Sequence, residues 1–150
     1  MAKFATITVK SLDEVNKFAT EAAFSGITTA LASNGATSAT FGAVFDMSER
    51  DEKYLILIKN ACSTSGAADK EVCIKAGNGI QGVNDVKKTD LGNGEYTWIQ
   101  IESGRFKNVT ENATLKALSS ATAADQISAK GKVFITGSSA DIEVAVFKLP

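Results

Sequence analysis

The stretch that most constrains the fold is residues 71–82, Glu-Val-Cys-Ile-Lys-Ala-Gly-Asn-Gly-Ile-Gln-Gly. Polar and apolar residues mix over its first half in the manner of a half-buried β-strand. The second half is rich in glycine, and its Asn-Gly pair is a strong turn signal because both residues tolerate positive φ. The only proline is Pro150, so Gly, Asn, Asp and Ser must make the turns. We therefore expect a mainly β domain of short strands joined by glycine-rich turns.

Strand-like segments recur along most of the chain. The run Tyr-Leu-Ile-Leu-Ile at 54–58 is continuously apolar, which predicts a strand buried on both faces. We expect it to form an antiparallel hairpin with the strand at 71–76, and residues 137–140 to be a second hairpin loop. The other predicted strands are 3–10, 41–46, 95–102 (with Tyr96 and Trp98 on one face), 132–136 and 141–149, with weaker signals at 27–31 and 105–109. Together they predict an antiparallel β-sandwich or barrel-like domain of about seven to eight strands.

One helix is predicted near the N-terminus. The sequence Ser-Leu-Asp-Glu at 11–14 has the form of a capping box, in which Ser11 caps the helix and Glu14 takes its third position. Apolar residues follow at helical spacing, so we expect a short helix over 12–24 that ends at Gly26. Two interpretations stay open: the helix covers its own sheet, or it is an amphipathic arm that docks on a partner.

The chain has 150 residues, the size of one domain. Two segments, 25–40 and 110–130, are rich in small residues, and they are the candidates for contacts that become ordered on binding. The second of these has the composition of an insertion between two strands, with one short helix near 113–124. The predicted organisation is a strand and helix arm at 1–26, a small-residue segment at 27–42, a β core at 43–109 and 131–150, and the insertion at 110–130.

Composition removes several classes of function. There is no histidine, so no Ser-His-Asp or Cys-His catalytic pair can form and no histidine can bind zinc. Two cysteines are too few for a thiolate zinc site. The net charge of −1 shows no excess of positive charge of the kind that binds nucleic acid. No run reaches the ~18 apolar residues of a membrane span. We expect no metal, no cofactor, no nucleic acid and no membrane partner.

The segment Gly77–Gly82 matches the letters G-x-G-x-x-G and follows a predicted strand. In dinucleotide-binding proteins the last glycine opens a helix whose N-terminus meets the pyrophosphate. Here residues 83–94 have no helical periodicity and soon reach another strand. We therefore interpret the motif as a structural loop.

The two cysteines and the scattered carboxylates give no catalytic signature. Cys62 and Cys73 would lie near facing positions if residues 54–76 formed a hairpin. Two alternatives stay open for them: a cross-strand disulfide, or two ordinary buried thiols. A glycosidase needs only two carboxylates, but no pair stands out among the 17 Asp and Glu residues. We do not expect an enzyme.

Four segments carry a family resemblance: Lys-Tyr-Leu-Ile-Leu-Ile-Lys-Asn at 53–60, Val-Cys-Ile-Lys-Ala-Gly-Asn-Gly-Ile-Gln-Gly-Val-Asn-Asp at 72–85, Glu-Ser-Gly-Arg-Phe-Lys-Asn at 102–108, and Gly-Lys-Val-Phe-Ile-Thr-Gly-Ser-Ser-Ala-Asp-Ile-Glu-Val-Ala-Val at 131–146. They resemble small structural proteins of tailed bacteriophages, in particular capsid decoration (cement) proteins of β-sandwich type. The resemblance implies a homo-oligomeric virion protein, made in the host cytoplasm, that binds the outside of the expanded head. Its implied partners are the major capsid protein and neighbouring copies of itself, as a trimer.

The family is defined by a surface, so no functional residue carries over from it. Residues 105–107 form a basic-aromatic cluster beside a turn, and two interpretations stay open: it contacts a partner surface, or it is an ordinary exposed corner of the fold. The candidate contact residues are Arg105, Phe106, Lys107, Leu115 and Leu118.

Other functions stay open beside the decoration protein. A tail-tube or head–tail connector subunit would use a long hairpin to line a lumen, and the 77–95 loop is its candidate. A small carbohydrate- or ligand-binding β module would need a pocket around Tyr96, Trp98 or Phe106. An enzyme would need a cleft with converging carboxylates of perturbed pKa.

Overall fold

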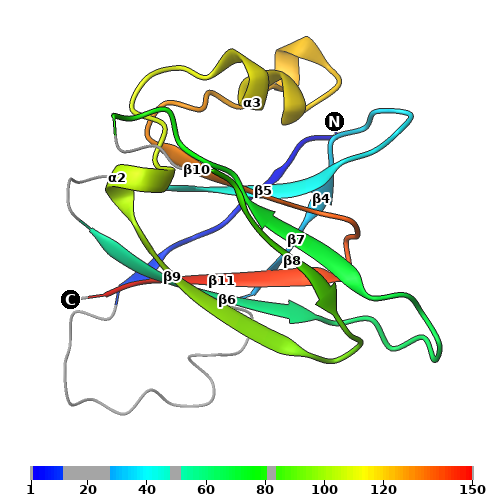
Figure 1. Ribbon diagram of the computed structural model, residues 1–150. Coiled ribbons are helices and arrows are strands. Elements are labelled where there is room, and N and C mark those ends of the chain that lie inside the picture. The colour runs from blue at the N-terminus through cyan, green and yellow to red at the C-terminus, as the bar shows by residue number, and fades with distance from the viewer. Residues whose placement is uncertain (1, 12–27, 48–51, 81–83, 150) are drawn as a thin grey trace.

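The computed structural model describes residues 2–11, 28–47, 52–80 and 84–149. Within these residues eleven short strands form two facing sheets, which gives a mainly β sandwich as predicted (Figure 1). The described strands do not close into a barrel. The predicted helix at 12–24 lies outside the described residues.

Sheet A has six strands. They are, in spatial order, β1 (Ala5–Thr6), β5 (Phe41–Asp46), β10 (Lys132–Gly137), β7 (Lys70–Ile74) and β8 (Val86–Leu91), with β4 (Ala32–Ser33) also paired to β5. Neighbours run antiparallel except β1, which is parallel to β5.

Sheet B has five strands. They are β2 (Lys10–Ser11), β11 (Ile142–Lys148), β6 (Lys53–Asn60) and β9 (Tyr96–Glu102), with β3 (Thr29–Ala30) also paired to β11. The parallel pairing of β2 with β11 makes this sheet mixed as well, so the prediction of purely antiparallel sheets was wrong. Strands β8 and β9 are the last strands of sheet A and sheet B.

The connections cross between the sheets, and this overturns both predicted hairpins. Strand β6 belongs to sheet B and β7 to sheet A, so residues 54–76 are not a hairpin. Residues 138–141 likewise join β10 of sheet A to β11 of sheet B. The expected single strand at 3–10 is also divided, into β1 and β2 on opposite sheets. Alternation of apolar residues indicates which face of a strand is buried, but it does not tell which sheet receives the strand.

The crossing connection also separates the two cysteines. Both Cys62 and Cys73 are free thiols, so the disulfide alternative was wrong. Cys73 is buried, and burial raises the pKa of its thiol further than the nearby Lys75 and Lys87 lower it. A raised pKa keeps the thiol protonated at neutral pH and makes it a poor nucleophile.

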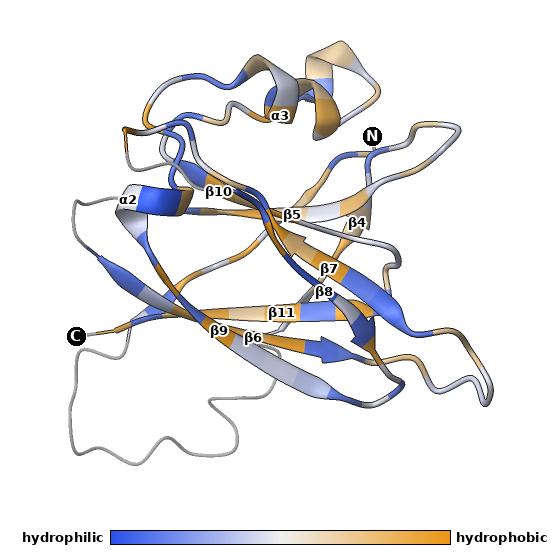
Figure 2. Cartoon of the chain, viewed as in Figure 1, coloured by the Kyte–Doolittle hydropathy of each residue, from blue (hydrophilic) through white to orange (hydrophobic). Residues whose placement is uncertain are grey.

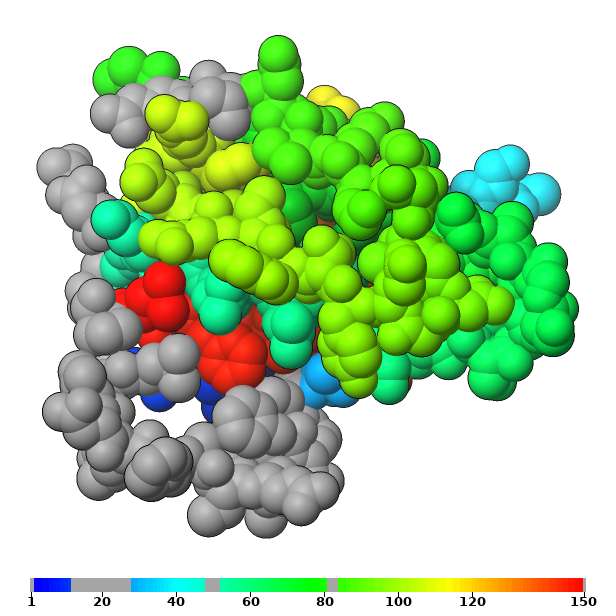
Figure 3. All heavy atoms as spheres, turned by 60° about the horizontal axis from the view of Figure 1, so that its bottom comes forward, coloured from blue at the N-terminus to red at the C-terminus, as the bar shows by residue number. Residues whose placement is uncertain are grey.

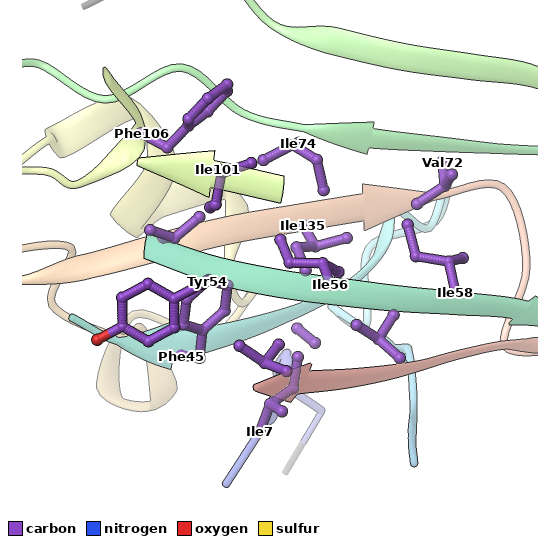
Figure 4. Packing of buried hydrophobic residues seen from close by; sticks show 14 of the residues in the cluster. Ile7, Phe45, Tyr54, Ile56, Ile58, Val72, Ile74, Ile101, Phe106 and Ile135 are labelled. Carbon is purple, nitrogen blue, oxygen red and sulfur yellow. The ribbon is translucent and has the colours of Figure 1, made fainter. Parts of the chain in front are cut away.

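The main core lies between the two sheets (Figure 2, Figure 4). Strand β6 alternates strictly, with Tyr54, Ile56 and Ile58 buried and the residues between them half-buried, so it is buried on one face rather than two. Its inward side chains meet those of sheet A, and the Tyr54 ring lies 5.7 Å from that of Phe45. Burying each such large apolar side chain contributes roughly 1.5–3 kcal/mol, which makes this face the main source of stability.

A second, smaller core lies on the outer face of sheet A. The insertion at 110–130 supplies α3 (Ala113–Leu118) and the 3₁₀ turn η1 (Ala123–Asp125), and α3 lies over the sheet in Figure 1. Helix α3 begins where the Asn112 side chain accepts a hydrogen bond from the Leu115 N–H at 3.2 Å. The buried residues of this cluster are Phe4, Val44, Leu115, Ala129 and Phe134. The insertion is thus part of the folded body, which corrects the expectation that it orders only on binding.

Asn34 fixes the small-residue segment to the same body. Its side-chain oxygen accepts hydrogen bonds from the N–H groups of Ala36 and Thr40, both at 3.1 Å. Its side-chain nitrogen donates to the Leu118 carbonyl at 3.0 Å. A single buried amide therefore shapes the turn between β4 and β5 and ties it to the end of α3.

The predicted strand at 105–109 is instead the single helical turn α2 (Ser103–Phe106). The Lys107 N–H donates to the Ser103 carbonyl at 3.0 Å, which closes the turn. Phe106 is only 5% exposed and joins the main core. Phe106 is the large apolar side chain that α2 buries, so its packing in the core is the main interaction that stabilises this turn.

Gly77 of the G-x-G-x-x-G segment packs directly on the chain after α2. Its N–H donates to the Arg105 carbonyl at 3.1 Å, and a Cβ at this position would lie 2.3 Å from the Lys107 carbonyl oxygen. The neighbouring Asn78 side chain accepts from the Val109 N–H at 2.9 Å and donates to the Thr110 carbonyl at 3.1 Å. The close approach of the two loops therefore accounts for the glycine at position 77.

We predict that Gly77→Ala destabilises the fold by about 1–3 kcal/mol, because the added methyl group must displace backbone. Gly79→Ala is the matched control, since a Cβ there meets its nearest neighbour at an ordinary 3.5 Å. Urea unfolding of the two variants measures the difference. Equal stability of the two variants would contradict the close approach at Gly77.

Candidate interaction surface

Strand β9 carries the most exposed aromatic side chains of the described chain. Tyr96 is 63% exposed and Trp98 is 68% exposed, and both lie on the outer face of sheet B, because the residue between them faces the core side. They stand beside Lys59 and Leu57 of β6 in the sheet register. The Lys59 ammonium lies 5.3 Å from the centre of the Tyr96 ring, which is a cation–π contact. Large exposed rings of this kind are typical of binding surfaces.

The outer face beside these rings is also largely apolar. Leu55 and Leu57 are half-buried there, and Ala145 and Phe147 of β11 continue the same rows across the sheet. In Figure 3 the yellow-green residues of β9 form a band along this face next to the teal residues of β6. Ala145 and Phe147 are themselves buried, so the accessible apolar surface consists of Tyr96 and Trp98 with the half-buried Leu55 and Leu57 beside them.

The far edge of β9 has no neighbouring strand among the described residues. All seven residues of β9 pair with β6 without a bulge, from Glu102 opposite Lys53 to Tyr96 opposite Lys59. In the described part of the chain, the backbone of Tyr96–Glu102 makes no hydrogen bond outside this ladder. The alternate N–H and C=O groups that face away from β6 form a row that another strand can pair with. We call this row the β9 edge.

Two depressions follow the β9 edge. The first has a volume of about 170 Å³ and lies between β8 and β9, with the apolar side chains of Ile58, Val72 and Ile74 among its lining residues. The second has a volume of about 450 Å³ and continues along Ile99–Glu102 to Arg105 and Phe106. They adjoin the inner side of β9, where Thr97 and Ile99 are half-buried and Ile101 is buried in the main core.

Strand β8 is the last strand of sheet A among the described residues, and it differs from β9 because it carries protective features. Lys88 stands opposite the core residue Val72, so it lies on the inward side of the strand. Its ammonium pairs with Asp90 at 2.6 Å, and a register shift interrupts the pairing with β7 between Lys70 and Val72. Inward charges and bulges discourage edge-to-edge pairing. Strand β9 has neither feature, and its single charged residue is Glu102.

The tip of the β7–β8 hairpin is held by Asp85. Its carboxylate accepts from the Ala76 N–H at 2.7 Å and pairs with the Lys75 ammonium at 2.7 Å. Partial burial raises the pKa of Asp85, but the bonds from Ala76 and Lys75 together outweigh burial and leave that pKa below its usual value. The same bond to Asp85 raises the pKa of Lys75. This pair stabilises the hairpin end near the first depression.

The five candidate contact residues from the sequence are not brought together on one surface. Arg105 is exposed and Lys107 is half-buried, beside the second depression. Phe106 lies in the main core, whereas Leu115 and Leu118 belong to the small core under α3. Phe106 and Leu115 are buried, whereas Arg105 is exposed and Lys107 and Leu118 are half-buried.

Two further apolar side chains are exposed away from β9. Ile80 is fully exposed and Val109 is 50% exposed, on two loops joined by the Asn78 hydrogen bonds. This spot is smaller than the β9 surface and lacks an aromatic ring. It provides a control position for tests of the larger surface.

No group of three or more Cys, Asp or Glu side chains in the described ranges could hold a metal ion. The one carboxylate that is buried among the described residues belongs to Glu52, which pairs with Lys148 at 2.9 Å and accepts a hydrogen bond from the Tyr54 hydroxyl. None of the described helices is long and apolar enough to cross a membrane. Comparison of the chain with protein-family models, with curated proteins and with solved structures gives no match.

Sequence reasoning found part of this surface. The period of two along 95–102 places Tyr96 and Trp98 on one face, as the structure has them. It missed β8, because Val-Lys-Lys-Thr-Asp-Leu has little apolar content. It also missed the β9 edge and the depressions, since these depend on strand order.

We predict that Asp85→Asn lowers stability at pH 7 by about 0.5 kcal/mol, the scale of a partly exposed ion pair. Because the folded pKa of Asp85 is depressed, its contribution is present above the unfolded pKa and is lost as pH falls through the folded pKa. Urea unfolding between pH 7 and pH 2 measures the free energy of unfolding of wild-type and Asp85→Asn protein. The difference between the two free energies should disappear at acid pH. A difference in free energy that stays constant with pH would contradict the assignment of this stability to the ionised Asp85 carboxylate.

Proposed function

We propose that this chain is a structural protein of a tailed-bacteriophage virion, a decoration protein that binds the outer surface of the expanded head and stabilises it by non-covalent contacts. The observation that carries the proposal is the exposed Tyr96–Trp98 surface on a compact sandwich. Aromatic side chains supply large contact area at small entropic cost and are enriched at binding hot spots. The capsid is proposed as the partner because four segments resemble capsid decoration proteins, namely 53–60, 72–85, 102–108 and 131–146.

The proposed mechanism needs no chemistry. Many copies on a repeated lattice reinforce one another, so each contact can be weak while the shell gains substantially. A rigid body with two cores suits this task because little conformational entropy is lost on docking.

A glycan-binding module is the second candidate, and the exposure of Tyr96 and Trp98 favours it. Two rings at positions i and i+2 of a strand lie on the same face, about 7 Å apart along the strand. The third ring considered for such a pocket, Phe106, is buried and gives no support. The tail-tube alternative has less in its favour, because residues 86–91 of its expected long hairpin are β8, paired with β7.

Copy number in purified particles of the source virus tests the decoration role. Quantitative mass spectrometry against the major capsid protein should give a ratio near one to one. A much lower ratio with co-purification in tails would favour the tube or connector alternative. Absence from particles would overturn the virion proposal and favour the glycan-binding module.

Substitution of Trp98 tests the surface itself. We expect Trp98→Ala to weaken binding to expanded heads at least tenfold, since removal of a central aromatic hot spot costs about 2 kcal/mol or more. Val109→Ala, which shortens an exposed apolar side chain elsewhere, is the matched control. Equal binding of both variants in a particle-sedimentation assay would exclude the Tyr96–Trp98 surface as the docking site.

A further inference from the structure

We propose that two copies of this chain associate through their β9 edges, in antiparallel pairing about a two-fold axis at Ile99, so that sheet B continues from one copy into the other. The inference rests on the unpaired edge of β9 and the depressions that adjoin its inner side. It does not depend on the capsid role, because the pairing is a property of the free chain.

The edge is the reason for expecting a strand as the occupant. A regular seven-residue edge strand without bulge, proline or inward charge is a template for another strand. The sheet A edge beside it carries the inward Lys88 and a bulge. Strand β8 thus carries features that hinder pairing with another strand, whereas β9 carries none of them. This difference points to β9 as the edge that pairs.

The register follows from strand length. Centring the axis on Ile99 is the arrangement that pairs all seven residues of β9. Ile99 then faces Ile99 of the other copy, Trp98 faces Gln100, and Tyr96 faces Glu102. The inward-facing Thr97, Ile99 and Ile101 of each copy extend the core along the depressions. Extending an apolar interior in this way is the usual driving force of obligate interfaces.

Charge complementarity identifies a second copy as the occupant. Glu102 of one copy comes beside Tyr96 of the other, whose ring already carries the Lys59 ammonium. The carboxylate and the Lys59 ammonium then flank the same Tyr96 ring with opposite charges, and the two-fold axis repeats this arrangement. No residue of β9 faces a like charge in this register, because Glu102 is the only charged residue of the strand.

The position of the edges fixes the symmetry. Strands β8 and β9 follow each other through the turn at 92–95 and flank the same depression, so both free edges lie on one side of the sandwich. Head-to-tail rings need complementary edges on different sides, whereas a two-fold contact uses one side of each copy.

Pairing would also double the aromatic surface. The outer faces of the two sheets become continuous, so both Tyr96–Trp98 pairs lie on one platform. A two-fold platform of this kind supplies two linked sites for any repeated partner.

A symmetric disulfide tests both the contact and the register. We would introduce Ile99→Cys into a full-length background in which Cys62→Ser and Cys73→Ala remove the native thiols. Residues directly opposite in an antiparallel pair have Cα atoms about 4.5–5.5 Å apart, within the range of a disulfide. Gln100→Cys is the matched control, because its symmetric counterpart lies roughly 8 Å away, beyond bridging distance.

The expected result is rapid oxidative dimerisation of the Ile99→Cys chain and little of the Gln100→Cys chain. Unmodified protein should sediment as a dimer that dissociates on dilution. Thr97→Lys, which adds an inward charge to β9 as Lys88 does to β8, should shift it to monomer, whereas Thr37→Lys on the β4–β5 loop should not.

Three outcomes would overturn the proposal. One is a monomer at all concentrations, the second is equal cross-linking at both positions, and the third is a dimer that Thr97→Lys leaves intact. Circular dichroism of each variant confirms folding before its result counts. A dimer in solution with no copies in virus particles would sink the capsid role alone, and a monomer found in particles would sink only the pairing.

Discussion

The inward-facing cluster between the two sheets is the interaction on which the rest of the structure depends. The chain passes from one sheet to the other between β6 and β7, β8 and β9, and β10 and β11, so neither sheet is built from a continuous stretch. The packing of inward residues such as Ile56 and Ile135 joins the two sheets across these crossings. The insertion at 110–130 then covers the outer face of sheet A through its own apolar cluster.

The same topology leaves one side of the sandwich open. Since β8 and β9 are consecutive in sequence but end different sheets, their edges diverge around an apolar depression. A sandwich must protect such edges or pair them. Here β8 is protected by Lys88, and β9 combines a free edge with two exposed rings. The surface that we propose for binding therefore results from the strand order, which places β9 at the end of sheet B.

Sequence reasoning predicted the strands with large apolar content and failed where the outcome depends on partners far along the chain. The strand predicted at 41–46 is β5 and that at 95–102 is β9, because regular side-chain alternation is a local signal. The predicted hairpins were wrong because strand order is set by the shared core. Phe106 of the predicted strand at 105–109 instead ends α2, and its ring packs in the main core. The aromatic pair of the surface was predictable, but its edge was not.

Amide hydrogen–deuterium exchange across residues 96–102 tests the central claim most directly. If the β9 edge is an interface, the amides that face away from β6 exchange rapidly in dilute protein and become protected as the concentration rises, while the exposed amides of β8 stay fast. Protection of β9 that does not change with concentration, or rapid exchange at every concentration, would contradict the account.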